Sequence, residues 1–65
     1  MNAFDMVYDE TYRGCLKAGC DESLAKNTAV ATLQKYKNNQ FTKVSKLIAQ
    51  SIVDAKKLIV KKKKR

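Results

Sequence analysis

The sequence has no proline and only two glycines, Gly14 and Gly19, among its 65 residues. Both residue types disfavour helix interiors, and folds rich in tight turns depend on them. Their scarcity therefore favours helices joined by short connections. The hydrophobic content of 45% is ordinary for a folded domain, so we do not expect a disordered chain.

Histidine is also absent, which removes the side chain most often used as a general acid or base at neutral pH. The carboxylates Asp9 and Glu10 are neighbours in sequence, so on a helix they point to different sides and do not form an acid–base pair. No glycine-rich phosphate loop is present, and no candidate nucleophile has a base close by in the sequence. We therefore expect a protein that is not an enzyme and needs no cofactor.

There are only two cysteines, Cys15 and Cys20, which is too few for the disulfide framework of a small secreted domain. A zinc site would need two more good ligands, and only carboxylates are left, so no metal site is expected. Cys15 falls on the apolar face of a predicted helix and is interpreted as a small buried residue. Cys20 falls in the following turn, where we expect it to be exposed and open to oxidation.

The sequence shows no targeting or membrane-spanning segment. Its first ten residues, MNAFDMVYDE, are acidic and contain no basic region followed by an apolar one, so they do not resemble a signal peptide. No uncharged apolar run approaches the roughly 20 residues of a spanning helix. These observations predict an intracellular protein, in the cytoplasm or in the nucleus if the host cell has one.

Acidic residues are nearly missing from the second part of the chain. Residues 26–65 contain twelve lysines and arginines against Asp54 alone, a formal charge of +11. Residues 1–25 carry five acidic and two basic residues, a formal charge of −3. A nucleic acid, an anionic membrane or an acidic protein surface would be attracted to the C-terminal part. The acidic part would be repelled by the same partner and should face away from it.

Apolar residues recur at intervals of three and four, which is the helical period. The pattern predicts a single domain over residues 1–60 and a basic tail over residues 61–65. The domain consists of three predicted helices, at about residues 3–18, 22–37 and 42–60. The connections are about two to five residues long, so consecutive helices should be antiparallel. The fold class is therefore all-α: a small three-helix bundle in which two short antiparallel helices pack on a longer C-terminal helix, with a mobile basic tail.

Particular residues mark the predicted helix ends. Gly19 is expected in the left-handed conformation that ends the first helix. Asp21 and Thr42 are expected to cap the N-termini of the second and third helices. The polar triplet at residues 38–40 is expected to break the chain between them. Gly14, inside the first helix, would let another helix approach closely.

Each of the first two predicted helices has one apolar stripe. In the first helix the stripe consists of Phe4, Val7, Tyr8, Tyr12, Cys15 and Leu16. In the second it consists of Ala25, Ala29, Leu33 and Tyr36, with Leu24 and Val30 at its edges. These stripes are the predicted contribution of the two helices to the core.

The third predicted helix has two apolar faces. The wide face spans about 140° of the helical wheel and is interpreted as the core face. Its residues are Val44, Leu47, Ile48, Ser51, Ile52, Ala55, Leu58 and Ile59. A narrow strip on the opposite side consists of Ala49, Val53 and Val60, flanked by lysines. A helix that buries one face does not need this second strip, so we interpret it as a protein-interaction surface.

Seven cations within the last ten residues are the strongest functional signal. Each cation that meets a phosphate releases counterions, which gives salt-dependent binding without sequence preference. The primary hypothesis is a small non-catalytic protein, such as a regulator, that binds the phosphate backbones of DNA or RNA. The residues expected to bind nucleic acid are Lys35, Lys37, Lys43, Lys46, Lys56, Lys57, Lys61, Lys62, Lys63, Lys64 and Arg65. A solubilising tail without a specific partner is the alternative interpretation of the basic run.

An alternative hypothesis is a helical protein-interaction module, an adaptor or inhibitor that binds a protein partner or forms a homodimer. It accounts for the narrow apolar strip and for the acidic N-terminal third, which nucleic acid does not explain. Binding to an anionic membrane surface ranks third. The predicted core face of the last helix lacks tryptophan and phenylalanine and should be covered by the other two helices.

Two local motifs bear on nucleic-acid recognition. Tyr36 lies between Lys35 and Lys37, an arrangement that suits either a base stacked between phosphate contacts or a tyrosine at the edge of the core. Gly19 suits the turn of a helix-turn-helix motif. However, the helix after it opens with Asp21 and Glu22, which would meet phosphates, so an ordinary helical hairpin is preferred.

Overall fold

The computed structural model of this chain describes the backbone of residues 3–62 and the side chains of residues 3–59. Within that part all regular structure is helical and there is no strand. The three helices are α1 (Ala3–Ala18), α2 (Glu22–Lys37) and α3 (Val44–Lys62). The prediction of a small all-helical domain with three helices packed together is confirmed.

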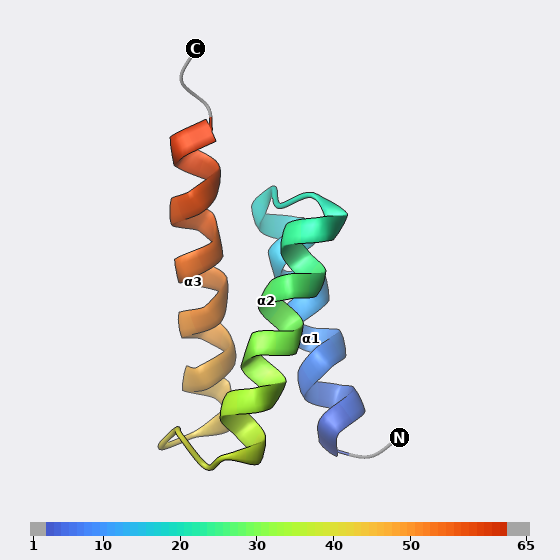
Figure 1. The fold of residues 1–65 in the computed structure, drawn as a ribbon, viewed down its shortest axis with the longest axis vertical. Helices are drawn as coiled ribbons and strands as arrows, with labels where there is room; N and C mark the ends of the chain where they lie inside the picture. Colours follow the sequence, from blue (N-terminus) through green and yellow to red (C-terminus); the bar gives the residue numbers. More distant parts are fainter. Residues whose placement is uncertain (1–2, 63–65) are drawn as a thin grey trace.

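Each helix packs against the other two. The chain reverses direction at the turn after α1 and again at the loop after α2, and α1 crosses behind α2 (Figure 1). α3 lies alongside this hairpin and extends beyond the α1–α2 turn at its C-terminal end (Figure 1). The last turns of α3 therefore have fewer neighbours than its middle.

The turn between α1 and α2 contains two capping motifs, one that ends α1 and one that begins α2. Gly19 has φ = 107°, its N–H donates to the Leu16 carbonyl (3.1 Å), and the Cys20 N–H donates to the Cys15 carbonyl (3.0 Å). These are the two hydrogen bonds of a Schellman motif, which satisfies the last carbonyls of a helix. One residue later, the Asp21 carboxylate accepts a hydrogen bond of 2.8 Å from the Leu24 N–H. The predicted roles of Gly19 and Asp21 are therefore confirmed.

The end of α2 repeats this geometry with asparagine in place of glycine. Asn39 has φ = 57°, its N–H donates to the Tyr36 carbonyl (3.2 Å), and the Gln40 N–H donates to the Lys35 carbonyl (2.9 Å). Asparagine is the residue that best tolerates the left-handed conformation after glycine. The break predicted at residues 38–40 therefore has a defined structure.

The third helix is shifted relative to its prediction. It begins at Val44, and its first turn is closed by a hydrogen bond of 3.0 Å from the Leu47 N–H to the Lys43 carbonyl. Thr42 lies one residue too early to be its cap, so that prediction is wrong. The helix continues to Lys62, because no glycine or proline interrupts it and lysine is a good helix former. The remaining tail residues, 63–65, lie outside the described part, so the predicted mobility stays a prediction.

Small side chains form the centre of the bundle. The residues with less than 3% of their surface exposed are Val7, Thr11, Cys15, Ala25, Ala29, Thr32 and Ala55. Gly14 belongs to the same region, since a Cβ placed on it would overlap with Cδ1 of Ile52 and lie 3.2 Å from its Cγ1. The proposed close approach at Gly14 is thus confirmed, with Ile52 of α3 as the neighbour.

The core contains three buried hydroxyl groups, those of Thr11, Thr32 and Ser51, and each of them has a hydrogen-bond partner. The Thr11 hydroxyl donates to the Val7 carbonyl at 2.8 Å. The Thr32 hydroxyl lies 2.8 Å from the Thr28 carbonyl and 2.6 Å from Oγ of Ser51, so it bridges α2 and α3. Ser51 was expected on the core face, whereas the threonines were not. Back-bonding within a helix makes their burial tolerable.

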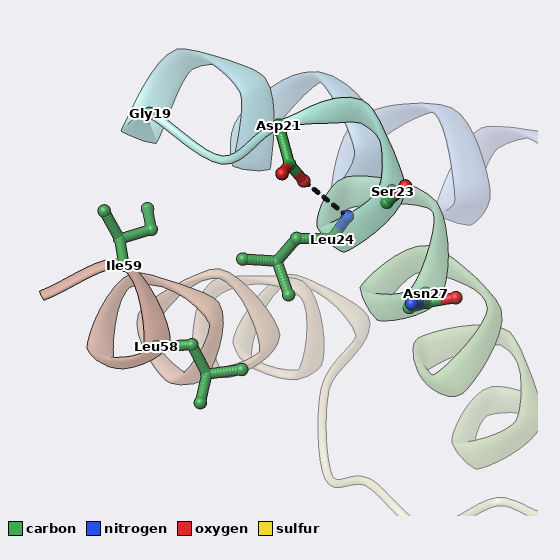
Figure 2. A pocket seen from close by; sticks show the side chains of 7 residues that line it. All are labelled: Gly19, Asp21, Ser23, Leu24, Asn27, Leu58 and Ile59. Atoms are coloured by element: carbon green, nitrogen blue, oxygen red, sulfur yellow. Dashed lines mark hydrogen bonds between the residues drawn. The ribbon is translucent and has the colours of Figure 1, made fainter. Parts of the chain in front are cut away.

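Some large apolar residues assigned to the core lie at its margin. Leu58 is 52% exposed, because its side chain lies at the groove between α2 and α3 and points away from Gly19 (Figure 2). Phe4 (45% exposed) and Leu16 (39% exposed) lie near opposite ends of α1. The prediction that Phe4, Leu16 and Leu58 are core residues is therefore wrong, whereas Ile59, next to Leu58, packs against the core cluster.

Candidate nucleic-acid interface

The side of α3 that points away from α1 and α2 is called the outer face. Its described residues are Lys46, Ala49, Val53, Lys56 and Lys57, and all of them are exposed. Helical spacing puts them opposite the buried residues of the same helix. The structure thus gathers lysines predicted to bind nucleic acid and two residues of the predicted protein-interaction strip on one surface. The side chain of the third strip residue, Val60, lies outside the described part.

The basic residues near the loop occupy a second region. Lys35 and Lys46 line the same groove, although they belong to α2 and α3. Lys43 is exposed immediately before α3, and Lys37 is exposed at the last position of α2. Lys46 therefore belongs to both regions and connects them.

The last five predicted residues are only partly described. The backbone of Lys61 and Lys62 belongs to α3, and their side chains lie outside the described part. Lys63, Lys64 and Arg65 lie outside it altogether. The exposed lysines of α3 are distributed along a helix of 19 residues, about 28 Å long, whose last residues are Lys61 and Lys62.

The lysines of the outer face are not neutralised from within. None of them forms an ion pair inside residues 3–59, where the ion pair that is found joins Asp9 and Arg13 of α1 at 3.2 Å. Asp54, the one carboxylate of α3, instead accepts a hydrogen bond of 3.0 Å from Nε2 of Gln50. Lys46, Lys56 and Lys57 of the outer face are therefore available to an external anion.

Tyr36 is already packed against other aromatic rings. Its ring stacks on Phe41 (centroids 5.3 Å apart, 18° between planes) and meets Phe4 edge-on (5.4 Å, 87°). Aromatic rings at these distances and angles stabilise each other. This cluster joins the start of α1, the end of α2 and the loop, and it favours the interpretation of Tyr36 as a residue at the edge of the core.

An open groove runs between α2 and α3 and is called the α2–α3 groove. Its end near the α1–α2 turn has a volume of about 420 Å³ and is lined by residues that include Gly19, Leu24 and Leu58. Figure 2 shows Leu24 reaching from α2 toward α3, with Ile59 pointing toward Gly19 and Leu58 away from it. This end is therefore mostly apolar, with the carboxylate of Asp21 at its rim.

The groove continues along both helices. A middle section of about 360 Å³ shares Leu24 and Leu58 with the first. A last section of about 300 Å³ lies between Lys35 and Lys46. No sequence pattern indicated the groove, because it arises from the spacing of two helices. The sequence signal that could have suggested the groove was the position of Leu24 at the edge of the apolar stripe of α2, and not at its centre.

The two thiols differ from their prediction in one respect. Cys15 is fully buried, as expected, but Cys20 is also buried, with 6% of its surface exposed. The reason is the Schellman motif, which folds the residue after Gly19 back onto the helix. Burial, and next the neighbouring Cys20 thiol, raise the pKa of the Cys15 thiol, while the Thr28 side chain opposes this.

The described residues offer neither a cluster of metal ligands nor a membrane-spanning helix. No group of three or more potential metal ligands of the His, Cys, Asp or Glu type is found within them. None of their helices has the length and apolarity needed to cross a membrane. Comparison with known proteins found no matching family, no significant match among curated proteins and none among solved structures.

Proposed function

We propose that this protein binds the phosphate backbone of nucleic acid, without catalysis and without sequence preference. The observation that supports the proposal is the exposed, unpaired lysine surface of α3 within a segment of formal charge +11. Such a surface gains affinity from counterion release and not from contacts to base edges. DNA and RNA backbones both provide this chemistry.

The spacing of the outer-face lysines suits an extended polyanion. Lys46 and Lys57 are eleven residues apart, which is three helical turns, so they lie in line and about 16 Å apart along the axis. A separation of this size spans several phosphates of one strand. The five basic residues at 61–65 add to the positive charge of the same segment. In a cell with a nucleus, this run would also suit a nuclear localisation sequence.

The acidic part of the chain orients the complex. Asp9 and Glu10 belong to α1, and α1 does not contribute to the outer face of α3. A polyanion that approached α1 would be repelled, whereas one that approached the outer face would be attracted. We therefore expect a complex with nucleic acid on one side of the bundle only.

A pair of double variants tests the proposal. Lys46→Gln with Lys57→Gln removes two charges from the outer face, and Lys17→Gln with Lys26→Gln removes two exposed charges from α1 and α2. Affinity for a labelled oligonucleotide, measured by anisotropy at low salt, should fall about tenfold in the first variant and about twofold in the second. Equal losses in both variants would mean that only the net charge matters and that the outer face is not the interface.

A second candidate function is a protein-interaction module, either for a partner or for a second copy. It is favoured by two exposed apolar residues, Val53 on the outer face and Leu58 in the α2–α3 groove. Sedimentation at low and high salt should detect self-association that Val53→Asp abolishes while the circular dichroism spectrum is retained. A monomer at every salt concentration would remove the homodimer from consideration.

A further inference from the structure

Cys15 and Cys20 occupy the two positions that a Schellman motif brings into contact. The Cys20 N–H donates to the Cys15 carbonyl at 3.0 Å, so the chain closes a tight loop between these residues. In this motif the side chains on either side of the loop usually make an apolar contact. Here both side chains are thiols, both are free, and both belong to one buried cluster with Ala25 and Ala55.

We propose that Cys15 and Cys20 form an intramolecular disulfide across the C-terminus of α1 when the chain meets a low-molecular-weight disulfide such as oxidised glutathione. The fold holds the two residues together before any oxidation takes place. It thereby provides the proximity that a disulfide requires of its partners. This proposal is independent of nucleic-acid binding.

The reaction proceeds by two thiol–disulfide exchanges. The Cys20 thiolate attacks one sulfur of glutathione disulfide, which forms a mixed disulfide and releases the first glutathione. The Cys15 thiolate then attacks the Cys20 sulfur and displaces the second glutathione. Two protein thiols are oxidised, one glutathione disulfide is reduced to two thiols, and the protons of the cysteines end on glutathione.

The order of these steps follows from the surroundings of each thiol. Cys20 is 6% exposed, whereas Cys15 is completely buried and its pKa is raised by that burial and by Cys20. Cys20 is the more exposed of the two sulfurs, so it is the one that glutathione disulfide reaches first. Since both sulfurs are shielded, the first step needs a local opening of the turn. The position of equilibrium, and not the rate, is therefore the decisive quantity.

The experiment measures the oxidation equilibrium of the full chain in glutathione redox buffers. Samples are quenched with acid, and the species are counted by intact mass. The disulfide form should be lighter than the reduced form by two hydrogens. The equilibrium constant should be at least about tenfold larger in native buffer than in concentrated urea, because the folded chain holds the thiols together. A constant that is equal or smaller in native buffer would overturn the proposal.

Two single-cysteine variants test whether the oxidised product is the Cys15–Cys20 disulfide. Cys15→Ser and Cys20→Ser each retain one thiol, so each should gain at most one glutathione and never lose two hydrogens. Wild-type chains that accumulate glutathione on both cysteines, or that form dimers on a non-reducing gel, would contradict an intramolecular bond. The oxidised wild type should also unfold at a higher urea concentration than the reduced protein, because the same linkage connects oxidation and folding.

Discussion

At the scale of single residues, Gly14 sets the distance between α1 and α3. Alanine at this position gains about 1 kcal/mol of helix propensity over glycine, but its Cβ would overlap with Cδ1 of Ile52. We expect Gly14→Ala to destabilise the wild type by about 1 kcal/mol, because overpacking outweighs the gain in propensity. Urea denaturation measures this change.

The matched background for this test is Ile52→Val, which removes the overlapping Cδ1 atom. In that background Gly14→Ala should become neutral or stabilising, so the double-mutant cycle should show a coupling of about 1 kcal/mol or more. If alanine has the same effect in both backgrounds, the two helices do not meet at Gly14.

The Cys15 thiol predicts a pH dependence of stability. Its pKa is raised in the folded state by burial and by Cys20. Above the unfolded pKa of the thiol, the folded chain therefore keeps the proton that the unfolded chain loses. The stabilising contribution is complete below the unfolded pKa of about 8.5 and is lost as the pH rises above it. We expect the free energy of unfolding to fall by up to about 1.4 kcal/mol per pH unit in this range.

Cys15→Ala provides the control for this prediction, because the other titrating groups remain. Its free energy of unfolding should decline less steeply above pH 8.5 than that of the wild type. Parallel curves for the two proteins would show that the thiol ionises equally well in the folded state.

At the scale of the helices, the hydroxyls of Thr32 and Ser51 provide a polar contact between α2 and α3. Thr32→Val removes the partner of Ser51 and leaves a buried hydroxyl, which should cost about 1–2 kcal/mol. Ser51→Ala should cost less, because the Thr32 hydroxyl keeps its bond to the Thr28 carbonyl. The double variant should recover part of the loss. Strictly additive effects in denaturation experiments would contradict this contact.

The loop after α2 contains a residue that can be improved. Asn39 has positive φ, where glycine is less strained, so Asn39→Gly should stabilise the protein by roughly 0.5 kcal/mol. Asn38 has φ = −90°, so glycine relieves no strain there. Asn38→Gly only makes the unfolded chain more flexible and should therefore destabilise the folded protein. Thermal unfolding of the two variants should shift in opposite directions. Shifts of the same sign would argue against the left-handed conformation of Asn39.

The elements themselves were largely predictable, because the end of α1 and both ends of α2 carry a local signal. Gly19 and Asp21 act through hydrogen bonds to residues three to five positions away, and sequence reasoning can see such contacts. The start of α3 was misplaced because Thr42 resembles a cap but the helix begins without one. The burial of Thr32 depends on Ser51, nineteen residues away, which no local pattern reveals.

At the scale of the whole molecule, the acidic residues Asp9 and Glu10 lie on α1, whereas the exposed lysines of the outer face lie on α3. Composition alone predicted a basic C-terminal part. The positions of Lys35 and Lys46 on one groove, and the exposure of Leu58, depend on how the helices pack and could not be read from composition. Periodicity assigns a residue to a face of its helix, but it does not say how far the neighbouring helices extend along that face.

We propose that α3 and the basic residues after it bind phosphate. The most direct test is the salt dependence of binding to a labelled oligonucleotide, for the full chain and for a chain ending at residue 60. The logarithm of the binding constant should fall linearly with the logarithm of the salt concentration. Removal of the five cations should reduce that slope by about four, with the helical circular dichroism retained. No binding at low salt, or a slope that the truncation leaves unchanged, would contradict the claim.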